Sequence, residues 1–591
     1  MQRTQILSRK TLLFVAILLA NWCGAASAQT NNSAADAAFM KISDEYFDQF
    51  YFPSSPTQAT QTGIHLYDDK LEDYSRAEVW REITTLKKFD ARIAAADPKP
   101  LSERVRGDRE LLLGNIHSTL LMLEIIRPWE KNPDIYSSGI TNTAFVMMSK
   151  KFAPAADRLR LLIAREKLMP AVFKDARENL KNPPKIYTEI ALEQLPGLVE
   201  FFKNDVPTAF SEVKDVALNA EFKQTNAAVI QALSDYEAWL RKEILPKSNG
   251  DFRIGAQTFV KKLAYDEMVD TPLDRLIEID MADLKRNQAE FARIAKEIAP
   301  QKTPEQVLAD LGADYPDPKN LLQSFRATFD GLIKFIADKK IITIPSDVRP
   351  ILQETPPFMR ATTFASMDTP GPFEKVAKEA YFHVTLPEAS WDKNQTAEFM
   401  AQFNYPVISN VAVHEAYPGH YIQFLTMHNV QDRVRKLLGA STNAEGWAHY
   451  CEQMMLDEGL ARAVAPNDVR RQQLLRLGQL QDALLRNARF IVGIKLHTRQ
   501  MSFDEGVEFF VKEGYQSHAV GVVETKRGTS DPTYLYYTLG KLEILKLRDD
   551  LKKQQGAAFS LQKFHDDFMR EGFPPIKIVR RALLHDDSPV M

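Results

Sequence analysis

The chain has 591 residues, of which 45% are hydrophobic and 26% charged, a composition that excludes both a disordered tail and an array of membrane spans. Its 75 Lys and Arg residues nearly balance 78 Asp and Glu residues, for a formal net charge of -3. This balance argues against a nucleic-acid partner, which usually requires a basic excess. Long segments rich in Leu, Ala, Glu, Lys and Arg indicate a mostly helical protein.

The first 28 residues have the three parts of a secretory signal peptide. Arg3, Arg9 and Lys10 form a basic region, an apolar run follows over residues 11–20, and Ala26-Ser27-Ala28 is a small-x-small cleavage site. A retained membrane anchor is the less favoured alternative, because a membrane span needs about 20 apolar residues. The sequence therefore predicts cleavage before Gln29 and export, to the periplasm if the source is bacterial.

Two cysteines bear on the state of the exported chain. Lipidation at Cys23 is not expected, because the bulky Trp22 precedes it at a position where a small residue is required. Cys451 is then the single cysteine of residues 29–591, so no intrachain disulfide can form. No later stretch approaches about 18 uninterrupted apolar residues, and no stable membrane span is expected.

Residues 29–340 form the first of two regions, and helical periodicity dominates it. Apolar side chains recur at three- and four-residue steps, which is typical of amphipathic helices that bury one face. Three such stripes are Leu112-Ile116-Leu120-Leu123, Leu161-Ala164-Leu168 and Leu273-Ile277-Met281-Leu284. Proline-containing breaks separate the segments. We interpret each stripe as packing scaffold.

Residues 341–591 form the second region, which begins with β-type sequence. Three runs of β-branched or aromatic residues, at 341–345, 358–365 and 380–386, are punctuated by prolines and predict a small sheet of short strands. Helices are expected from there to the C-terminus, the longest over Asn467–Gln500, whose leucines are interpreted as a buried face without chemistry. The expected fold is therefore mainly α, with a small sheet at the edge of the candidate site.

The segment with the clearest chemistry is Val411-Ala-Val-His414-Glu415-Ala-Tyr-Pro418-Gly419-His420. Neutral imidazole is a good zinc ligand, and a Glu beside the first His can act on a metal-bound water without binding the metal. An H-E-x-x-H helix places its two imidazoles four residues apart on one face. Here they are six residues apart, which turns a regular helix by about 600° and leaves His420 about 120° from His414.

Pro418 and Gly419 offer a way around this geometry. Pro418 has no N–H to donate to the carbonyl of His414, so the helix is expected to break within the motif. A bulge or loop of two extra residues would bring His420 back to the side of His414. We therefore predict that both imidazoles share one metal ion. The alternative is that they are ordinary core or surface histidines, since short motifs also match by chance.

A third ligand is available in Thr442-Asn-Ala-Glu445-Gly-Trp-Ala-His449-Tyr-Cys-Glu452. Its two Glu residues and His449 are spaced by four and three residues and share one helical face. A Glu on a following helix can complete a site with two His, and Glu445 is the candidate. The alternative for Glu445 is a capping box with Thr442. His449 and Glu452 are candidates for orienting a ligand, with packing or solvated positions as the alternative.

These two segments resemble a bacterial family called domain of unknown function 885. The family's H-E-A-x-P-G-H signature is met at every fixed position from His414 to His420, and Glu445-Gly-Trp-Ala follows. The family looks like a distant branch of the gluzincin metallopeptidases, and the resemblance extends over most of the mature chain. It implies a largely helical fold, one zinc ion on His414, His420 and Glu445, and Glu415 as general base.

A C-terminal pattern of the same family is E-x-x-R followed by a Tyr shortly before Gly-Lys. The matching residues here are Glu524, Arg527, Tyr537, Gly540 and Lys541. The intervening residues depart from the commoner P-G-Q-A version, which leaves the choice between Tyr536 and Tyr537 open. A Tyr hydroxyl or an Arg guanidinium can stabilise an oxyanion or hold a substrate carboxylate, and His518 is a further candidate donor. The alternative for the tyrosines is aromatic packing.

These assignments predict an exported zinc metallopeptidase that acts on short peptides. Zinc would polarise the scissile carbonyl, Glu415 would transfer the proton, and Tyr537 or Arg527 would stabilise the oxyanion. Two other classes stay open: a zinc amidohydrolase acting on a non-peptide or cell-wall amide, and a non-catalytic exported binding protein on the same scaffold. A serine hydrolase is disfavoured because the sequence has no G-x-S-x-G elbow.

Overall fold

Helices make up most of the structure, a computed structural model that describes residues 34–355, 364–388, 391–588 and 590–591. The predicted signal peptide with its Cys23 lies outside the described residues, as do residues 358–363 of the second predicted strand. In the described part of the chain, no helix has both the length and the apolar character needed to cross a bilayer.

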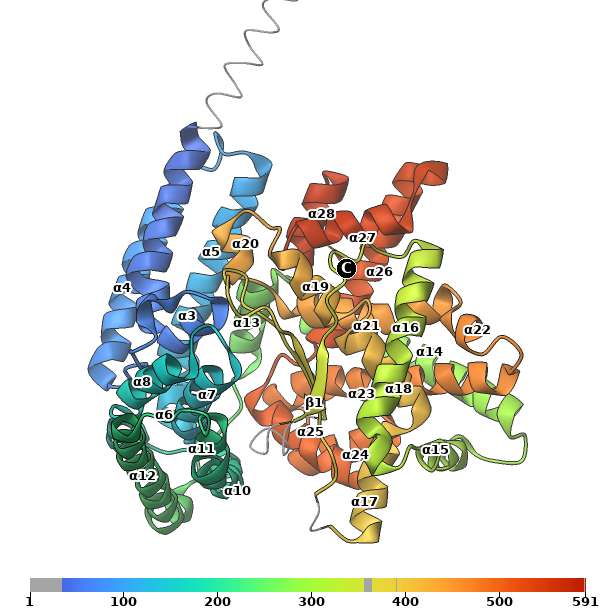
Figure 1. Ribbon diagram of the computed structural model, residues 1–591. Helices are drawn as coiled ribbons and strands as arrows, with labels where there is room; N and C mark the ends of the chain where they lie inside the picture. Colours follow the sequence, from blue (N-terminus) through green and yellow to red (C-terminus); the bar gives the residue numbers. More distant parts are fainter. Residues whose placement is uncertain (1–33, 356–363, 389–390, 589) are drawn as a thin grey trace, which may run out of the picture.

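The N-terminal helices lie together on one side of the molecule (Figure 1, blue to green). They are α2 (Phe52–Ser54), α3 (Pro56–Thr62), α4 (Arg76–Ala94), α5 (Glu103–Leu120), α6 (Pro128–Lys131), α7 (Asp134–Ser149), α8 (Ala155–Glu166), α9 (Met169–Asn179), α10 (Lys185–Glu200), α11 (Val206–Ala209) and α12 (Val216–Trp239). Prolines begin several of them as the sequence predicts: Pro128 is the first residue of α6, and Pro184 directly precedes α10. A proline tolerates this position because the first N–H of a helix has no intrahelical acceptor.

The apolar faces of these helices form hydrophobic cores, as the apolar stripes of the sequence predict, but the stripe predicted for α8 is not its buried face. Leu112 and Ile116 are fully buried in α5. In α8, however, the buried face carries Leu159, Leu162 and Ile163, whereas Leu168 follows the helix and is 45% exposed. Apolar residues of α8 satisfy three- and four-residue spacing on two adjoining faces, so spacing alone selected the wrong one.

Four helices connect this side of the molecule to the rest: α13 (Ala256–Glu267), α14 (Leu273–Ile298), α15 (Pro304–Gly312) and α16 (Leu321–Lys339). Helix α14 packs along the longest helix of the C-terminal region, where Leu284 and Phe291 meet Leu477 and Leu484. Helices from before residue 341 therefore support the helices that carry the candidate site.

A three-stranded sheet follows, in the order β1-β3-β2. Strand β1 (Ile351–Glu354) is parallel to β3 (Tyr381–Val384), and β2 (Ala365–Asp368) is antiparallel to β3. The small sheet and its β3 were predicted, but residues 341–345 are not a strand. Ile341 and Ile342 are buried in the main core without strand pairing, and the carbonyl of Ile341 accepts a hydrogen bond from His565 Nδ1 at 2.7 Å. Their apolar character therefore reflects burial rather than pairing.

Most of the C-terminal helices pack against one another on the other side of the molecule (Figure 1, yellow to red), and the short helix of residues 433–437 lies beside α5. They are α17 (Lys393–Met400), α18 (Tyr405–Glu415), α19 (His420–Met427), α20 (Arg433–Leu437), α21 (Ser441–Asp457), α22 (Leu460–Val464), α23 (Val469–His497), α24 (Phe503–Lys512), α25 (His518–Ser530), α26 (Tyr536–Gln555), α27 (Leu561–Arg570) and α28 (Ile576–Leu584). Helix α23 confirms the long helix predicted over Asn467–Gln500. Its middle is buried on most sides, as expected of a helix that is apolar around its circumference.

Helices α21 and α26 approach each other closely at a pair of glycines. A Cβ placed on Gly446 would lie 2.5 Å from the Cα of Gly540, so neither position has room for a side chain. This contact brings Glu445, the neighbour of Gly446, close to Tyr537, which lies one turn before Gly540. The packing of two small residues thereby joins the two sequence motifs.

Candidate metal centre

The helix carrying His414 breaks where the sequence predicts. Helix α18 ends at Glu415 and α19 begins at His420, with a tight turn between them that contains a cis Tyr417–Pro418 peptide bond. The amide of Gly419 donates to the carbonyl of Val413 at 3.0 Å. A Cβ on Gly419 would lie 1.7 Å from the carbonyl oxygen of His414, so the turn has room for glycine alone.

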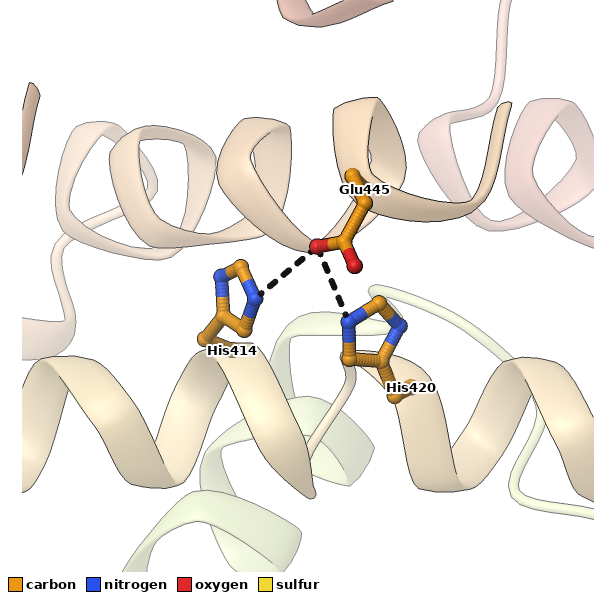
Figure 2. A group of neighbouring side chains, drawn as sticks. All are labelled: His414, His420 and Glu445. Atoms are coloured by element: carbon orange, nitrogen blue, oxygen red, sulfur yellow. Dashed lines mark ion pairs between the residues drawn. The ribbon is translucent and has the colours of Figure 1, made fainter. Parts of the chain in front are cut away.

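The break places both imidazoles beside one carboxylate. Glu445 Oε2 lies 3.5 Å from His414 Nε2 and 3.4 Å from His420 Nε2. Figure 2 shows the two rings reaching toward this oxygen from the two sides of the helix break, with Glu445 on the helix opposite. One ligand atom from each residue lies within 4.8 Å of the other two. Ligands about 2.0–2.1 Å from a tetrahedral zinc ion are about 3.3 Å apart, which agrees with both distances to Glu445.

The donor set fits a catalytic type of zinc site. Two imidazole nitrogens and one carboxylate oxygen are typical protein ligands of such sites, which keep a further position open. The side chains of His414 and His420 are buried, whereas that of Glu445 is 28% exposed. The centre is therefore enclosed on the imidazole side and accessible beside the carboxylate.

The alternative interpretation of Glu445 as a helix cap is wrong. Thr442 lies inside α21, whose N-cap residue is Ala440 and has no side-chain hydrogen bond. The cap comes from another helix: Glu267, the last residue of α13, accepts hydrogen bonds from the amides of Ser441 (3.2 Å) and Thr442 (2.9 Å). Because Glu267 satisfies these amides, Glu445 is free to face the imidazoles.

A second carboxylate orients the first imidazole. Glu452 Oε1 lies 2.7 Å from His414 Nδ1 and 3.1 Å from Arg486 Nη2, while its Oε2 accepts a bond from Asn410 Nδ2 at 3.0 Å. His449 Nδ1 lies 3.2 Å from the same Oε2. A carboxylate on the far nitrogen of a ligating His fixes the ring and raises its basicity. By contrast, His420 Nδ1 is buried without a hydrogen-bond partner among the described residues.

Burial and charge set the protonation of the site in the metal-free protein. Burial lowers the pKa of His414, but hydrogen bonds to Glu445 and Glu452 outweigh it and raise that pKa to about 9. Burial raises the pKa of Glu445, and the two imidazoles reverse this and hold it well below its usual range. Burial raises the pKa of Glu415, against the opposing charges of the imidazoles. Glu415 is thus a stronger proton acceptor than an exposed glutamate.

The predicted Tyr and Arg residues lie together next to this centre. Arg527 Nη2 is 3.3 Å from the hydroxyls of both Tyr536 and Tyr537. The Tyr536 hydroxyl also donates to Asp531 at 3.0 Å. Burial and the charge of Glu445 raise the pKa of Tyr537, so its hydroxyl stays protonated and can donate a hydrogen bond.

His518, in contrast, is exposed at the first residue of α25. Within the described residues it makes no hydrogen bond or ion pair with the three ligands, Arg527 or Tyr537. Nine residues, or about 13 Å along a helix, separate it from Arg527. The structure therefore does not bring His518 together with the other candidates.

Two arginines of α23 were missed, because this helix was interpreted as core alone. Arg486 lies over the Tyr537 ring at 5.5 Å and Arg489 at 5.1 Å. Arg489 also holds Glu524 through two bonds of 2.7 Å. Asp482, Arg486 and Arg489 are spaced by four and three residues, so a charged stripe on an otherwise buried helix was the available signal.

Comparisons with known proteins agree with the observed fold. The family described as bacterial protein of unknown function (DUF885) matches residues 56–583. No curated protein matches the chain. A solved structure of a candidate lipoprotein of unknown function from Shewanella oneidensis is 25% identical, covering 92% of this chain and 99% of its own, with a TM-score of 0.76. A candidate lipoprotein from Colwellia psychrerythraea is 17% identical, covering 94% and 99%, with a TM-score of 0.77.

Proposed function

The chain belongs to the DUF885 family of bacterial proteins of unknown function, and we propose that it is an exported zinc-dependent hydrolase of peptide bonds. The observation that carries this proposal is the convergence of His414, His420 and Glu445 on one point, with Glu415 directly after the first ligand. Two His and a downstream Glu, with a second Glu next to the first His, are also the residue types of the gluzincin peptidases. A distant relation to them is part of the proposal.

Each residue of the centre has a role in this chemistry. A bound zinc ion supplies a Lewis acid for the scissile carbonyl and acidity for the attacking water. Glu415 accepts the proton of that water and returns it to the leaving amine, a task that its raised pKa supports. Glu452 holds the ring of His414 so that Nε2 faces Glu445 Oε2, the other side of the set that would hold the ion.

Tyr537 and Arg527 supply the donors for the developing oxyanion. The hydroxyl of Tyr537 is held by Arg527 at 3.3 Å, and three guanidinium groups surround its ring: those of Arg486, Arg489 and Arg527. Preorganised donors of this kind act strongly in a site from which water is excluded. The positive cluster also favours the negative charge that develops on the carbonyl oxygen as water attacks.

Metal content tests the proposed site directly. Purified protein should bind close to one equivalent of zinc by plasma mass spectrometry, and His420→Ala and Glu445→Ala should each lose it. His585→Ala is the matched control, because His585 is exposed directly after the last turn of α28. Wild-type protein that takes up no metal after reconstitution with zinc would refute the proposed site and favour a binding protein.

Turnover tests the role of Glu415. Glu415→Gln should retain zinc and lose at least about a hundredfold in kcat on peptides found in a library of short sequences, because a general base contributes roughly 10²–10⁴-fold. Glu398→Gln, at an exposed position of α17, should leave kcat unchanged. If only non-peptide amides are cleaved, the protein is an amidohydrolase of another class. A fully active Glu415→Gln variant would exclude Glu415 as the base.

Export and lipid attachment form a separate part of the proposal. Both solved neighbours are described as candidate lipoproteins, while the sequence favours cleavage before Gln29 over lipidation of Cys23. The intact mass of the protein from cell fractions distinguishes the two: a mature chain starting at Gln29 supports a soluble periplasmic protein. A lipid-bearing chain that starts at Cys23 would mean that it is anchored.

A further inference from the structure

A cavity of about 420 Å³ lies between the N-terminal helices and the C-terminal region. One wall comes from α5, its π-helical extension Leu121–Ile126 and α6, the second from α13, and the third from residues 438–441 and 529–536. Figure 1 shows α13 between the two sides of the molecule. The volume falls within the range of about 300–1,000 Å³ that is usual for small-molecule pockets.

Two contacts connect this cavity to the candidate metal centre. Ser441 lines the cavity and lies four residues before Glu445 on α21, so both residues share one face of the helix. Tyr536 lines the cavity as well. Arg527 Nη2 donates to the hydroxyls of both Tyr536 and Tyr537, at 3.3 Å each. The cavity therefore reaches within about one helical turn of the ligand Glu445.

Most charged side chains on the cavity wall already have partners. Lys262 pairs with Asp266 at 2.6 Å. Glu267 is held by the amides at the start of α21, and Asp531 is 3.2 Å from Arg527. The acidic side chains of the wall therefore already have hydrogen-bond or ion-pair partners, although the amides that hold Glu267 do not cancel its charge.

Lys131 is the exception. It is half-buried at the last residue of α6 and lines the cavity. Within the described residues its ammonium group has no ion pair and no hydrogen bond. The adjoining Glu130 is engaged elsewhere, by Arg76 at 3.2 Å and Arg127 at 3.0 Å. A partly buried cation without a counterion favours an anion in the space that it faces.

We propose that this cavity binds a carboxylate group of the substrate, with Lys131 as its counterion. This inference rests on the proposed function and narrows the substrates to short peptides that carry a free carboxylate on one side of the cleaved bond. The carboxylate can be the C-terminal α-carboxylate or an acidic side chain. Both present the same chemistry to Lys131, and the test separates them.

Binding to the zinc-reconstituted Glu415→Gln protein tests the inference without turnover. Isothermal titration calorimetry compares Ala-Ala-Ala with its C-terminal amide, and Ala-Ala-Glu-amide with Ala-Ala-Gln-amide. If the site takes a C-terminal carboxylate, Ala-Ala-Ala should bind about tenfold to a hundredfold more tightly than its amide, as expected for a hydrogen bond between charged groups. If it takes an acidic side chain, Ala-Ala-Glu-amide should exceed Ala-Ala-Gln-amide by the same factor. Adding Lys131→Met should remove this preference, and Lys131→Arg should retain it. Lys151→Met is the matched control, because Lys151 is exposed and does not line the cavity.

The outcomes separate this inference from the proposed function. Equal binding of both members in both pairs, or a preference that survives Lys131→Met, would overturn the carboxylate site. Failure of all four peptides to bind would overturn it as well. A preference that depends on Lys131 establishes the site even if wild-type protein cleaves no peptide, and in that case the proposed peptidase function alone fails.

Discussion

Glu452 is a buried carboxylate that orients the first candidate ligand, His414, without being a ligand itself. It contacts His414, His449, Asn410 and Arg486, all within 3.2 Å. We expect Glu452→Gln to lower zinc affinity about tenfold to a hundredfold, as is usual when the partner of a ligating His is removed. Competition with a chromogenic chelator measures the affinity, and circular dichroism checks that the variant is folded. Unchanged affinity in a folded variant would mean that Glu452 only packs.

The raised pKa of His414 predicts how zinc binding depends on pH. The pKa is about 9 in the metal-free protein, so the imidazole carries a proton at neutral pH and must lose it to bind zinc. Affinity should therefore increase about tenfold per pH unit from pH 7 toward pH 9 and then level off. Calorimetry in buffers of different ionisation enthalpy should show at least one proton released at pH 7.5. A pH-independent affinity over this range would contradict the assigned protonation state.

At the scale of elements, the break between α18 and α19 depends on Gly419. The requirement at this position is for space, because a Cβ would lie 1.7 Å from the His414 carbonyl oxygen. Gly419→Ala should cost about 1–3 kcal/mol of stability through forced backbone shifts and should abolish zinc binding. Gly331→Ala is the matched control, because a Cβ there meets nothing within 4 Å at an exposed position of α16. Urea unfolding and metal content measure both effects; a zinc-loaded Gly419→Ala protein would contradict the steric argument.

This break could be predicted because its cause is local. A proline without an amide and an adjoining glycine lie inside the motif itself, so the sequence indicates both the interruption and its length. The choice between ligand and cap for Glu445 could not be made this way. It depends on Glu267, which lies 174 residues before Ser441 in the chain. A capping group supplied by another helix leaves no trace in the sequence around the helix that it caps.

The prediction for α23 was incomplete and that for the first strand was wrong, for related reasons. Leucine spacing identified α23 and its buried side chains, but Arg486 and Arg489 on the same helix face the tyrosine that α26 supplies. For residues 341–345, β-branched composition signals burial as well as strand formation, and only the partner segments decide between them. Both errors concern contacts between distant segments, which periodicity in one segment does not contain.

For the whole molecule, one buried arginine joins three distant parts of the chain. Arg435 of α20 pairs with Asp108 of α5 at 2.6 Å and with Glu571 directly after α27, and its side chain is 2% exposed. Arg104 of α5 bonds the same Glu571 at 3.2 Å. The cluster therefore fixes the N-terminal helices against the C-terminal region. Both parts contribute walls to the cavity.

Replacing this arginine should destabilise the protein in a pH-dependent way. Burial raises the pKa of Asp108 to about 6 although Arg435 opposes it, so without Arg435 the pKa would rise further. At pH 8 the Arg435→Met protein must either keep the Asp108 charge buried without its partner or protonate that carboxyl, and the loss of the buried pair should cost up to about 3–5 kcal/mol. At pH 5 Asp108 is protonated in both proteins, and the difference should shrink. Urea midpoints at the two pH values measure this change.

Arg433→Met is the control for this prediction, because Arg433 lies two residues away and joins the same two sides of the molecule. Its partners Asp44 and Asp48 are at the surface, with side chains 46% and 62% exposed. Solvent screening limits such pairs to about 1 kcal/mol or less, with little change between pH 5 and pH 8. Equal losses from both substitutions would show that the buried cluster is no stronger than a surface pair, and that other contacts hold the two sides together.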